Sequence, residues 1–437
     1  MRPSRSGHHG PRAGRRPLLA AGAAAAAGVL MIGVFAAVDT HRPQRIGYFA
    51  DWNVANRGYT IKDVDDSGAA RRLTRLLWAF GDVSGDGLCH VPDGQRWELY
   101  QRRYEADGSV SGEEDAYDQP LAGSLNQLRQ LRERHPDLGA SISLGGWNWS
   151  RHFSVAARTE ESRRAFVDSC IDLWLRGDLP ETDDEPQGGE GSAEGVFDGI
   201  DLDWEWPGGG GNSHNVEHPD DPANFDLLLA EFRRGLDELS DETGREYTLS
   251  VSVSGSASQT EAHTDEMFEY ADFVSVQGYD FAGSWSDETA PHSNLYPTAS
   301  DPDANSADAA VRRYLDLGAP PHKLVLGLPA FGRGWQGVEG GGDGLGVPAD
   351  PADDVYDGAT MAFSDLEELD GERHLDEEAG AYWIRDGDHW WAYDNPDVVA
   401  LKGEYVLDHG LGGLMVWNLD MDADGELVRA MDRSLNG

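Results

Sequence analysis

Three carboxylic acids, Asp201, Asp203 and Glu205, alternate with apolar residues in the segment 197–207, FDGIDLDWEWP. In a β-strand, where side chains alternate between two faces, the acids share one face and the apolar residues share the other. Because unpaired like charges are costly to bury, we expect the acidic face at a strand end that opens into an active site. Crowded anions and partial desolvation raise the pKa of a carboxyl there, so that it can act as a general acid near neutral pH. Glu205, the last of the three, is the predicted acid.

Two other interpretations of this acidic row remain open from the residues alone. Rows of Asp and Glu also hold Mg²⁺ or Ca²⁺, and an acidic edge strand can simply face water. A water-facing strand accounts for the apolar face, but it gives no reason for Trp206 and Pro207 directly after three carboxylates. We therefore favour the catalytic interpretation, without a bound metal.

Short apolar runs that could form this strand and its neighbours recur along the chain, with helical patterns between them. The expected strands are 45–51, 75–82, 140–144, 199–205, 248–254, 273–277, 323–328 and 413–418. The expected helices are 121–134, 160–176, 222–243, 306–317, 396–409 and 426–434. This alternation predicts an α/β fold, a (β/α)₈ TIM barrel with its active site at the carboxyl ends of the strands. Glu205 ends one expected strand and Trp417 nearly ends the last, which fits that position.

Two regions interrupt the alternation. Residues 181–195 are acidic and rich in glycine, which predicts a solvated surface loop. A stretch at about 334–394, between strands seven and eight, is longer than ordinary connections between elements. It predicts a small inserted subdomain within a catalytic barrel that spans 41–437.

The composition argues against several classes of partner. The chain has 35 Lys and Arg against 79 Asp and Glu, a formal net charge of −44, which disfavours nucleic acid and anionic membrane surfaces. Its lysines are Lys62, Lys323 and Lys402 alone. An acidic surface with so little lysine indicates adaptation to high salt, where charge repulsion is screened. A compositional bias without salt dependence is the alternative.

Residues 1–40 are typical of a signal peptide or an N-terminal anchor. Arg12, Arg15 and Arg16 precede the run 18–38, which is apolar and uncharged. The arginine pair is compatible with a twin-arginine signal. Cleavage after Ala36 would release a secreted protein, whereas an uncleaved run is long enough to anchor it to the outer face of the cell membrane.

The two cysteines, Cys89 and Cys170, are too few for a disulfide framework or a zinc cluster. Cys170 lies in a helical pattern and is expected to be a small buried side chain. The sequence leaves open whether a single disulfide joins them.

The acidic row also resembles a family signature. Asp198, Asp201, Asp203 and Glu205 occupy the acidic positions of DxxDxDxE, the motif of glycoside hydrolase family 18, the chitinases. Three further segments are similar to motifs of that family: 143–147 (SLGGW) to SxGGW, 276–281 (VQGYDF) to the segment with Met-x-Tyr-Asp, and 412–417 (GGLMVW) to the last strand. The resemblance extends from about Arg45 to the C-terminus. It implies an α+β insertion between strands seven and eight, as in bacterial members, and glycines after strand three that let the backbone approach the acidic strand closely.

The resemblance implies a substrate-assisted mechanism. Glu205 would protonate the glycosidic oxygen, and the substrate's own N-acetyl carbonyl would attack the anomeric carbon. Asp203 would orient the acetamido group and stabilise its developing charge, sharing a proton or hydrogen bond with Asp201. Tyr279 would hydrogen-bond the acetamido group, and Asp198 would support the strand rather than touch the substrate.

The resemblance also implies residues that bind the sugar. Trp417 would form the floor under the sugar at the cleavage point, because a flat indole suits the apolar face of a pyranose. The other expected contacts are Asp280, Trp147, Trp285, Arg333, Phe80 and Gln277. The sequence departs from the family at Gln277, where the family has Met, at Ser286, where it has an acid, and at Ala290 and Pro291, where it has Gly-His.

Together these features predict a monomeric chitinase that cleaves β-1,4-linked N-acetylglucosamine in chitin and chito-oligosaccharides, without a cofactor or metal. One alternative is a related endo-β-N-acetylglucosaminidase that acts on N-glycan cores or peptidoglycan fragments. Another is a non-catalytic chitin-binding lectin, which the presence of Glu205 disfavours because such proteins typically lose the terminal acid. Endo or exo action, and crystalline or soluble substrate, stay open.

Overall fold

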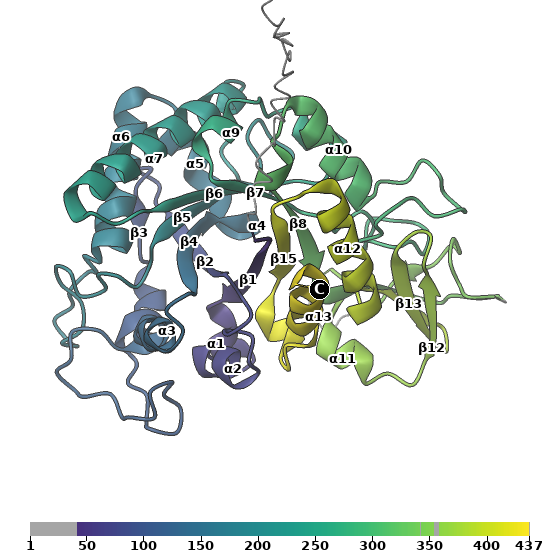
Figure 1. Cartoon of the computed structure of the whole chain (residues 1–437), viewed down its shortest axis with the longest axis horizontal. Helices are drawn as coiled ribbons and strands as arrows, with labels where there is room; N and C mark the ends of the chain where they lie inside the picture. The colour runs from purple at the N-terminus through teal and green to yellow at the C-terminus, as the bar shows by residue number, and fades with distance from the viewer. Residues whose placement is uncertain (1–41, 341, 354–357, 437) are drawn as a thin grey trace, which may run out of the picture. The chain divides into compact units, whose positions relative to one another are not determined.

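Eight parallel strands close into a barrel in the computed structural model, which describes residues 42–340, 342–353 and 358–436 (Figure 1). The strand order is β1, β15, β8, β7, β6, β5, β4, β2, and the pairing of β1 with β2 closes the ring. These strands are β1 (Gln44–Ala50), β2 (Arg75–Val83), β4 (Gly139–Gly145), β5 (Gly199–Asp203), β6 (Thr248–Val253), β7 (Phe273–Val276), β8 (Leu324–Pro329) and β15 (Gly413–Trp417). The predicted (β/α)₈ barrel is confirmed. The predicted signal or anchor at 1–40 lies outside the described residues.

The two faces of the acidic strand are those that its alternation predicts. On β5, Ile200 and Leu202 belong to the core between the strands and the outer helices, where Trp204 stacks on Phe153. Asp201 lies on the opposite face and accepts hydrogen bonds from strands across the barrel interior. The strand ends at Asp203, two residues before the predicted end, so Glu205 extends beyond it.

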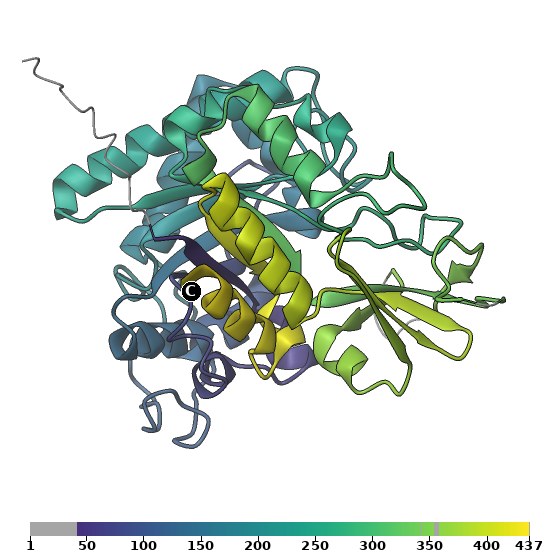
Figure 2. The ribbon, with the colours of Figure 1, turned by 45° about the vertical axis from the view of Figure 1, so that its right-hand side comes forward.

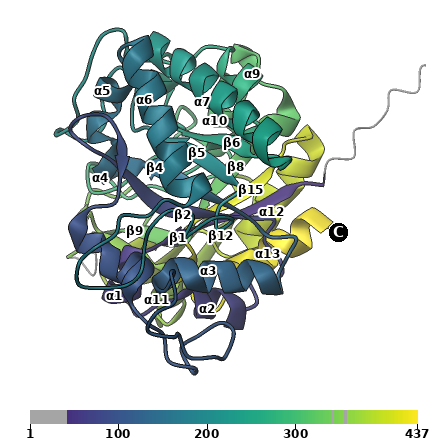
Figure 3. The ribbon, with the colours of Figure 1, turned by 90° about the vertical axis from the view of Figure 1, so that its left-hand side faces the viewer.

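Helices surround the barrel, with α6 and α7 on one side and α2 and α3 on the other (Figure 3). They are α1 (Trp52–Asn56), α2 (Ile61–Asp66), α3 (Gly123–Arg134), α4 (Gly146–Trp149), α5 (Phe153–Ala157), α6 (Glu160–Cys170), α7 (Asp221–Thr243), α8 (Ala257–Thr260), α9 (Met267–Tyr270), α10 (Ala307–Leu317), α12 (Pro396–His409) and α13 (Glu426–Asn436). The predicted helix 160–176 is α6 continued by wider π-helical turns, Ile171–Arg176. Among the described residues, every helix is too short or too polar to cross a lipid bilayer.

The insertion between β8 and β15 is a second, antiparallel sheet beside the barrel (Figure 2). Its strands are β9 (Phe331–Gln336), β10 (Asp350–Pro351), β11 (Thr360–Ala362), β12 (Glu372–Asp376), β13 (Ala381–Asp386) and β14 (His389–Ala392), and it carries the helix α11 (Phe363–Glu367). Three buried tryptophans, Trp335, Trp383 and Trp390, form much of its own core. The sheet begins at Phe331, three residues before the predicted boundary of 334, because β9 follows β8 almost without a connection.

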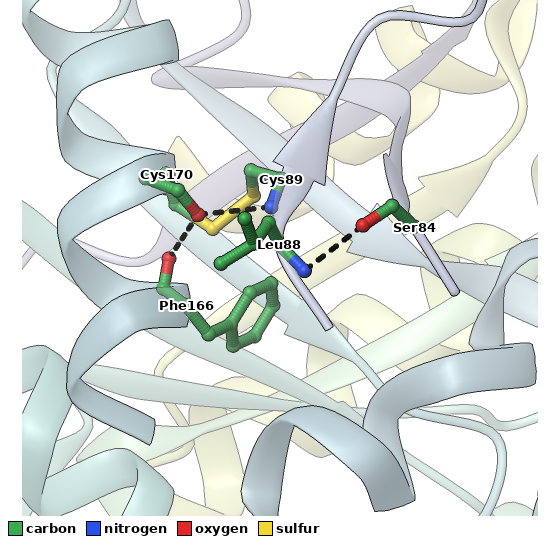
Figure 4. The surroundings of a disulfide bond; sticks show 6 residues. Ser84, Leu88, Cys89, Phe166 and Cys170 are labelled. Carbon is green, nitrogen blue, oxygen red and sulfur yellow. Dashed lines mark hydrogen bonds between the residues drawn. A yellow bond between two sulfur atoms is a disulfide. The ribbon is translucent and has the colours of Figure 1, made fainter. Parts of the chain in front are cut away.

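The segment between β2 and β4 carries a short strand, β3 (Cys89–His90), antiparallel to β2. A disulfide joins Cys89 to Cys170 at the end of α6, which settles the pairing that the sequence left open (Figure 4). The Cys89 amide also donates to the Ser169 hydroxyl at 2.9 Å. The bridge and this hydrogen bond together fasten the segment to α6.

The prediction that 181–195 is a solvated loop is wrong for part of that segment. Gln187 and Ala193 are buried, and a β-bridge pairs Leu179 with Gly189. The amide of Gln187 donates to the carbonyls of Tyr117 and Gln119 at 3.0 and 3.3 Å. The chain therefore turns back against the barrel, and only part of its acidic character faces water.

Candidate active site

The carboxyl ends of the barrel strands open into a cleft of about 900 Å³. Of the eleven residues predicted for the site, ten line this cleft: Glu205, Asp203, Tyr279, Trp417, Asp280, Trp147, Trp285, Arg333, Phe80 and Gln277. Asp201, the eleventh, is fully buried beneath it. The fold thus gathers the predicted set from strands that are far apart in the sequence.

Asp201 is held by hydroxyl groups from the two strands beside β5 and from β1 across the barrel. Its Oδ2 accepts from Tyr48 at 2.9 Å and from Ser143 at 2.7 Å, and its Oδ1 accepts from Ser250 at 2.6 Å. Ser143 on β4 and Ser250 on β6 lie directly opposite Asp201 in the sheet, so strand register sets these contacts. Burial raises the pKa of Asp201, and the hydroxyl donors oppose that rise. The predicted Asp201–Asp203 hydrogen bond is not found among the described contacts, because the hydroxyls bind both oxygens of Asp201.

Asp203 is buried above Asp201, with only 3% of its surface exposed. Within the described ranges its Oδ1 has no hydrogen-bond partner. Burial raises the pKa of Asp203 well above its usual value, and the charges of Glu205 and Asp201 raise it further, while a hydrogen bond from Ser252 opposes them. Asp203 therefore combines a raised pKa with a free oxygen that can meet a ligand.

Glu205 is fixed through its backbone as well as its side chain. Its amide donates to the Ser150 hydroxyl at 2.9 Å, and its carbonyl accepts from the Asn215 amide at 2.7 Å. Burial raises the pKa of the Glu205 carboxyl to about 8; a hydrogen bond from Gln277 lowers it and the charge of Asp280 raises it. Glu205 thus holds a proton at neutral pH, the state that a general acid needs.

Asp280 differs from Glu205 in that its pKa is lowered. Burial alone would raise its pKa, but the charge of Arg333 and hydrogen bonds from His292 and Arg333 lower it to about 2. Two nitrogens of Arg333 lie 2.9 Å from Asp280 Oδ1, and the same side chain stacks over Trp285 at 5.3 Å. Because Arg333 comes from β9, this ion pair joins the inserted sheet to the barrel at the rim of the cleft.

Aromatic side chains form the rest of the cleft. Trp417 at the end of β15 stacks on Phe80 at 5.6 Å and meets the edge of Tyr48 at 5.0 Å. Trp147 and Trp285, with 50% and 58% of their surfaces exposed, stand at the rim. Flat, partly exposed rings of this kind are suited to the apolar faces of sugars.

The glycines after β4 allow the close approach that the sequence predicts. A Cβ on Gly145 would lie 2.4 Å from the carbonyl oxygen of Asp203, and the φ of Gly145, +107°, is a conformation that glycine tolerates best.

Asp198, the first acid of the motif, forms ion pairs: its carboxylate lies 2.6 Å from Arg75 and also pairs with Arg132. Asp198 lies outside the cleft and supports the strand, as expected.

Several site residues were missed in the sequence. Trp52, Trp149, Trp206 and Asn212 also line the cleft. His292, fully buried 3.7 Å from Asp280 Oδ1, was missed as well. The sequence did point to it, because His292 directly follows Ala290 and Pro291, which stand where the resemblance implies Gly-His. The described residues contain no group of three or more His, Cys, Asp and Glu suited to a metal ion.

The profile of Glycosyl hydrolases family 18 matches residues 44–422, nearly the whole barrel and its insertion. The chain belongs to glycoside hydrolase family 18.

Relatives in family 18 cover most of the chain. Chitinase C of Streptomyces lividans is 33% identical over 398 residues, which are 89% of this chain and 59% of that protein. Chitinase A1 of Niallia circulans is 30% identical over 428 residues, 89% of this chain and 58% of that protein. The chain thus spans about three fifths of the length of these relatives.

Solved structures share the fold. The catalytic domain of the psychrophilic chitinase B from Arthrobacter TAD20 is 41% identical, with a TM-score of 0.86 over 90% of this chain and 95% of that one. A family 18 N-acetylglucosaminidase from Paenibacillus barengoltzii is 27% identical, with a TM-score of 0.71 over 90% and 99%.

Proposed function

We propose that this family 18 protein is a chitinase, which hydrolyses β-1,4-N-acetylglucosamine linkages of chitin and chito-oligosaccharides by substrate-assisted, retaining catalysis. The observation that carries the mechanism is the raised pKa of the carboxyls at the base of the cleft. Glu205, Asp203 and Asp201 all have raised pKa values, and the ionised Asp280 is bound by Arg333. Asp201 lies beneath the cleft and Asp280 is bound by Arg333, so neither is a free nucleophile, and the acetamido oxygen of the substrate takes that role.

The proposed reaction has two steps. Glu205 gives its proton to the glycosidic oxygen as the bond to the anomeric carbon breaks, and the acetamido carbonyl oxygen attacks that carbon to form a cyclic oxazolinium ion. Asp203 orients the acetamido N–H and stabilises its positive charge, and the Tyr279 hydroxyl supports the same group. The Glu205 carboxylate then accepts a proton from water, which attacks the anomeric carbon and reopens the ring with retained configuration.

The aromatic cleft and the relatives favour chitin as the substrate. Trp147, Trp285 and Trp417 offer stacking surfaces for several sugars, and the relatives from Streptomyces and Niallia are named chitinases. The Paenibacillus N-acetylglucosaminidase favours a second candidate, release of single N-acetylglucosamine units. Secretion or anchoring through residues 1–40, and a monomeric state, are part of the same proposal.

The proposal is tested with paired substrates. We expect turnover of a fluorogenic chitobioside and at least about 10²-fold slower turnover of the same compound with free 2-amino groups, because only the N-acetyl group supplies the nucleophile. Equal rates on both would contradict the mechanism, and binding without turnover would favour a lectin. A time course of products from chitohexaose separates internal cleavage from release of single units.

A further inference from the structure

Gln277, which stands where the sequence resemblance implies Met, contacts the proposed acid. Its side-chain Nε2 lies 3.4 Å from Glu205 Oε1 and 3.5 Å from the hydroxyl of Ser252. Ser252, on β6, in turn hydrogen-bonds Asp203. One amide group therefore stands between the two carboxyls that the proposed reaction uses.

We infer that Gln277 is a positioning residue that holds Glu205 and Asp203 in one hydrogen-bonded set and thereby determines the alkaline limit of activity. This inference rests on the proposed role of Glu205 as the general acid. It assigns to Gln277 a role beyond contact with the sugar.

The chemistry of the side chain gives the direction of the effect. An amide has two N–H donors, whereas the thioether of methionine has none. A donor to a carboxylate favours its ionised form and lowers its pKa. Burial raises the pKa of Glu205 to about 8, and the hydrogen bond from Gln277 is the contact that lowers it. Removing the amide raises the pKa of Glu205 directly, and it also frees Ser252 from the amide that links it to Glu205.

Other ionisable groups face Glu205 from the elements around it. They are Asp201 and Asp203 on β5, Tyr48 on β1, Tyr279 and Asp280 after β7, and Arg333 on β9, with His292 behind Asp280. Of these, Asp280 raises the pKa of Glu205. Each of these groups is kept in a Gln277 variant, and what changes beside Glu205 is the loss of the amide with its contacts to Glu205 and Ser252.

The test compares Gln277→Met with the wild type and with Gln259→Met. Gln259 lies on α8 outside the residues that line the cleft, so it controls for the exchange of side chain. The rate constants kcat and kcat/KM on a fluorogenic chitobioside are measured across the pH range. Since Glu205 must be protonated to act, we expect the alkaline limb of Gln277→Met to move upward by roughly 0.5–1 pH unit. The Gln259→Met profile should match the wild type.

A residue that only packs under the sugar would change kcat or KM by the same factor at every pH. An alkaline limb that stays in place in Gln277→Met would therefore overturn the inference. Gln277→Asn serves as a second variant, because it keeps the amide but is one methylene shorter. The alkaline limb of its pH profile should fall between those of the wild type and Gln277→Met.

A readout without turnover separates this inference from the proposed function. In a carboxyl ¹³C NMR titration, the signal that disappears in Glu205→Gln is assigned to Glu205. Its pKa should be higher in Gln277→Met than in the wild type, and an equal value would overturn the inference even if the wild type were inactive on chitobioside. An inactive wild type would contradict the proposed function alone.

Discussion

Two carboxyl groups in the same cleft have opposite acid strengths. Asp280 is surrounded by Arg333 and His292, which lower its pKa to about 2. Glu205 has no cationic partner among the causes that act on it, and burial raises its pKa to about 8. The cleft thus holds one anion that joins its wall to the inserted sheet and one neutral acid that can give a proton, and the difference comes from Arg333 and His292.

Keeping an acid neutral in this way should reduce stability at high pH. The pKa of Glu205 in the folded protein, about 8, is above its usual value of 4.5. Its contribution to stability is therefore present below about pH 4.5 and is lost as the pH rises towards 8, at about 1.4 kcal/mol per pH unit. We expect Glu205→Gln to have a higher Tm than the wild type at pH 8 and an equal Tm at pH 4. Thermal melts across this range measure the difference.

The control for this prediction is Glu269→Gln, which changes an exposed glutamate on α9. Its Tm should follow that of the wild type at every pH. If Glu205→Gln also followed the wild type between pH 4 and 8, Glu205 would not be a neutral buried acid.

Individual site residues were predictable where the alternation or a motif marked them. The three acids and Trp417 were found because residue type and spacing agreed. The hydroxyls that bind Asp201 were not found, although Ser250 and Ser252 alternate along β6 as the acids do along β5. Serine occurs in strands for many reasons, so its hydrogen-bond partner can be identified only once the strand register is known.

Elements were predictable where one pattern dominated. All eight barrel strands were found within a few residues, since each is a short, largely buried segment that is apolar throughout or on alternate residues. The short strands of the insertion were not separated, because β10 and β11 have two and three residues and are defined by pairing with β9. The segment 181–195 was misjudged for a similar reason. Its burial depends on contacts with residues near 117–120, some 70 positions away.

At the scale of the whole molecule, the net charge of −44 dominates. At low ionic strength the mutual repulsion of so many carboxylates opposes the folded state. The Debye length falls from about 10 Å at 0.1 M salt to about 3 Å at 1 M, so this repulsion fades with added salt. Arg234, which lies between Glu231 and Glu238, illustrates that the few cations are already used for pairing.

We therefore expect the Tm, and the activity on a neutral chito-oligosaccharide, to rise from roughly 0.05 to 2 M NaCl, a range over which screening changes severalfold. The neutral substrate removes any direct effect of salt on its attraction to the cleft. Melting curves that coincide across this range would leave the acidic surface as a compositional bias.

Glu205 is the residue on which the proposed substrate-assisted hydrolysis depends most, since it is the acid. The most direct test is the turnover of Glu205→Gln on chitobioside, measured together with its affinity for chitohexaose by calorimetry. The amide keeps the shape of the side chain but has no proton to transfer, so we expect kcat to fall by at least about 10²–10⁴-fold. The affinity should stay within about threefold of the wild type, a difference of less than 1 kcal/mol. A variant that kept more than about a tenth of the wild-type rate, with binding unchanged, would contradict the claim.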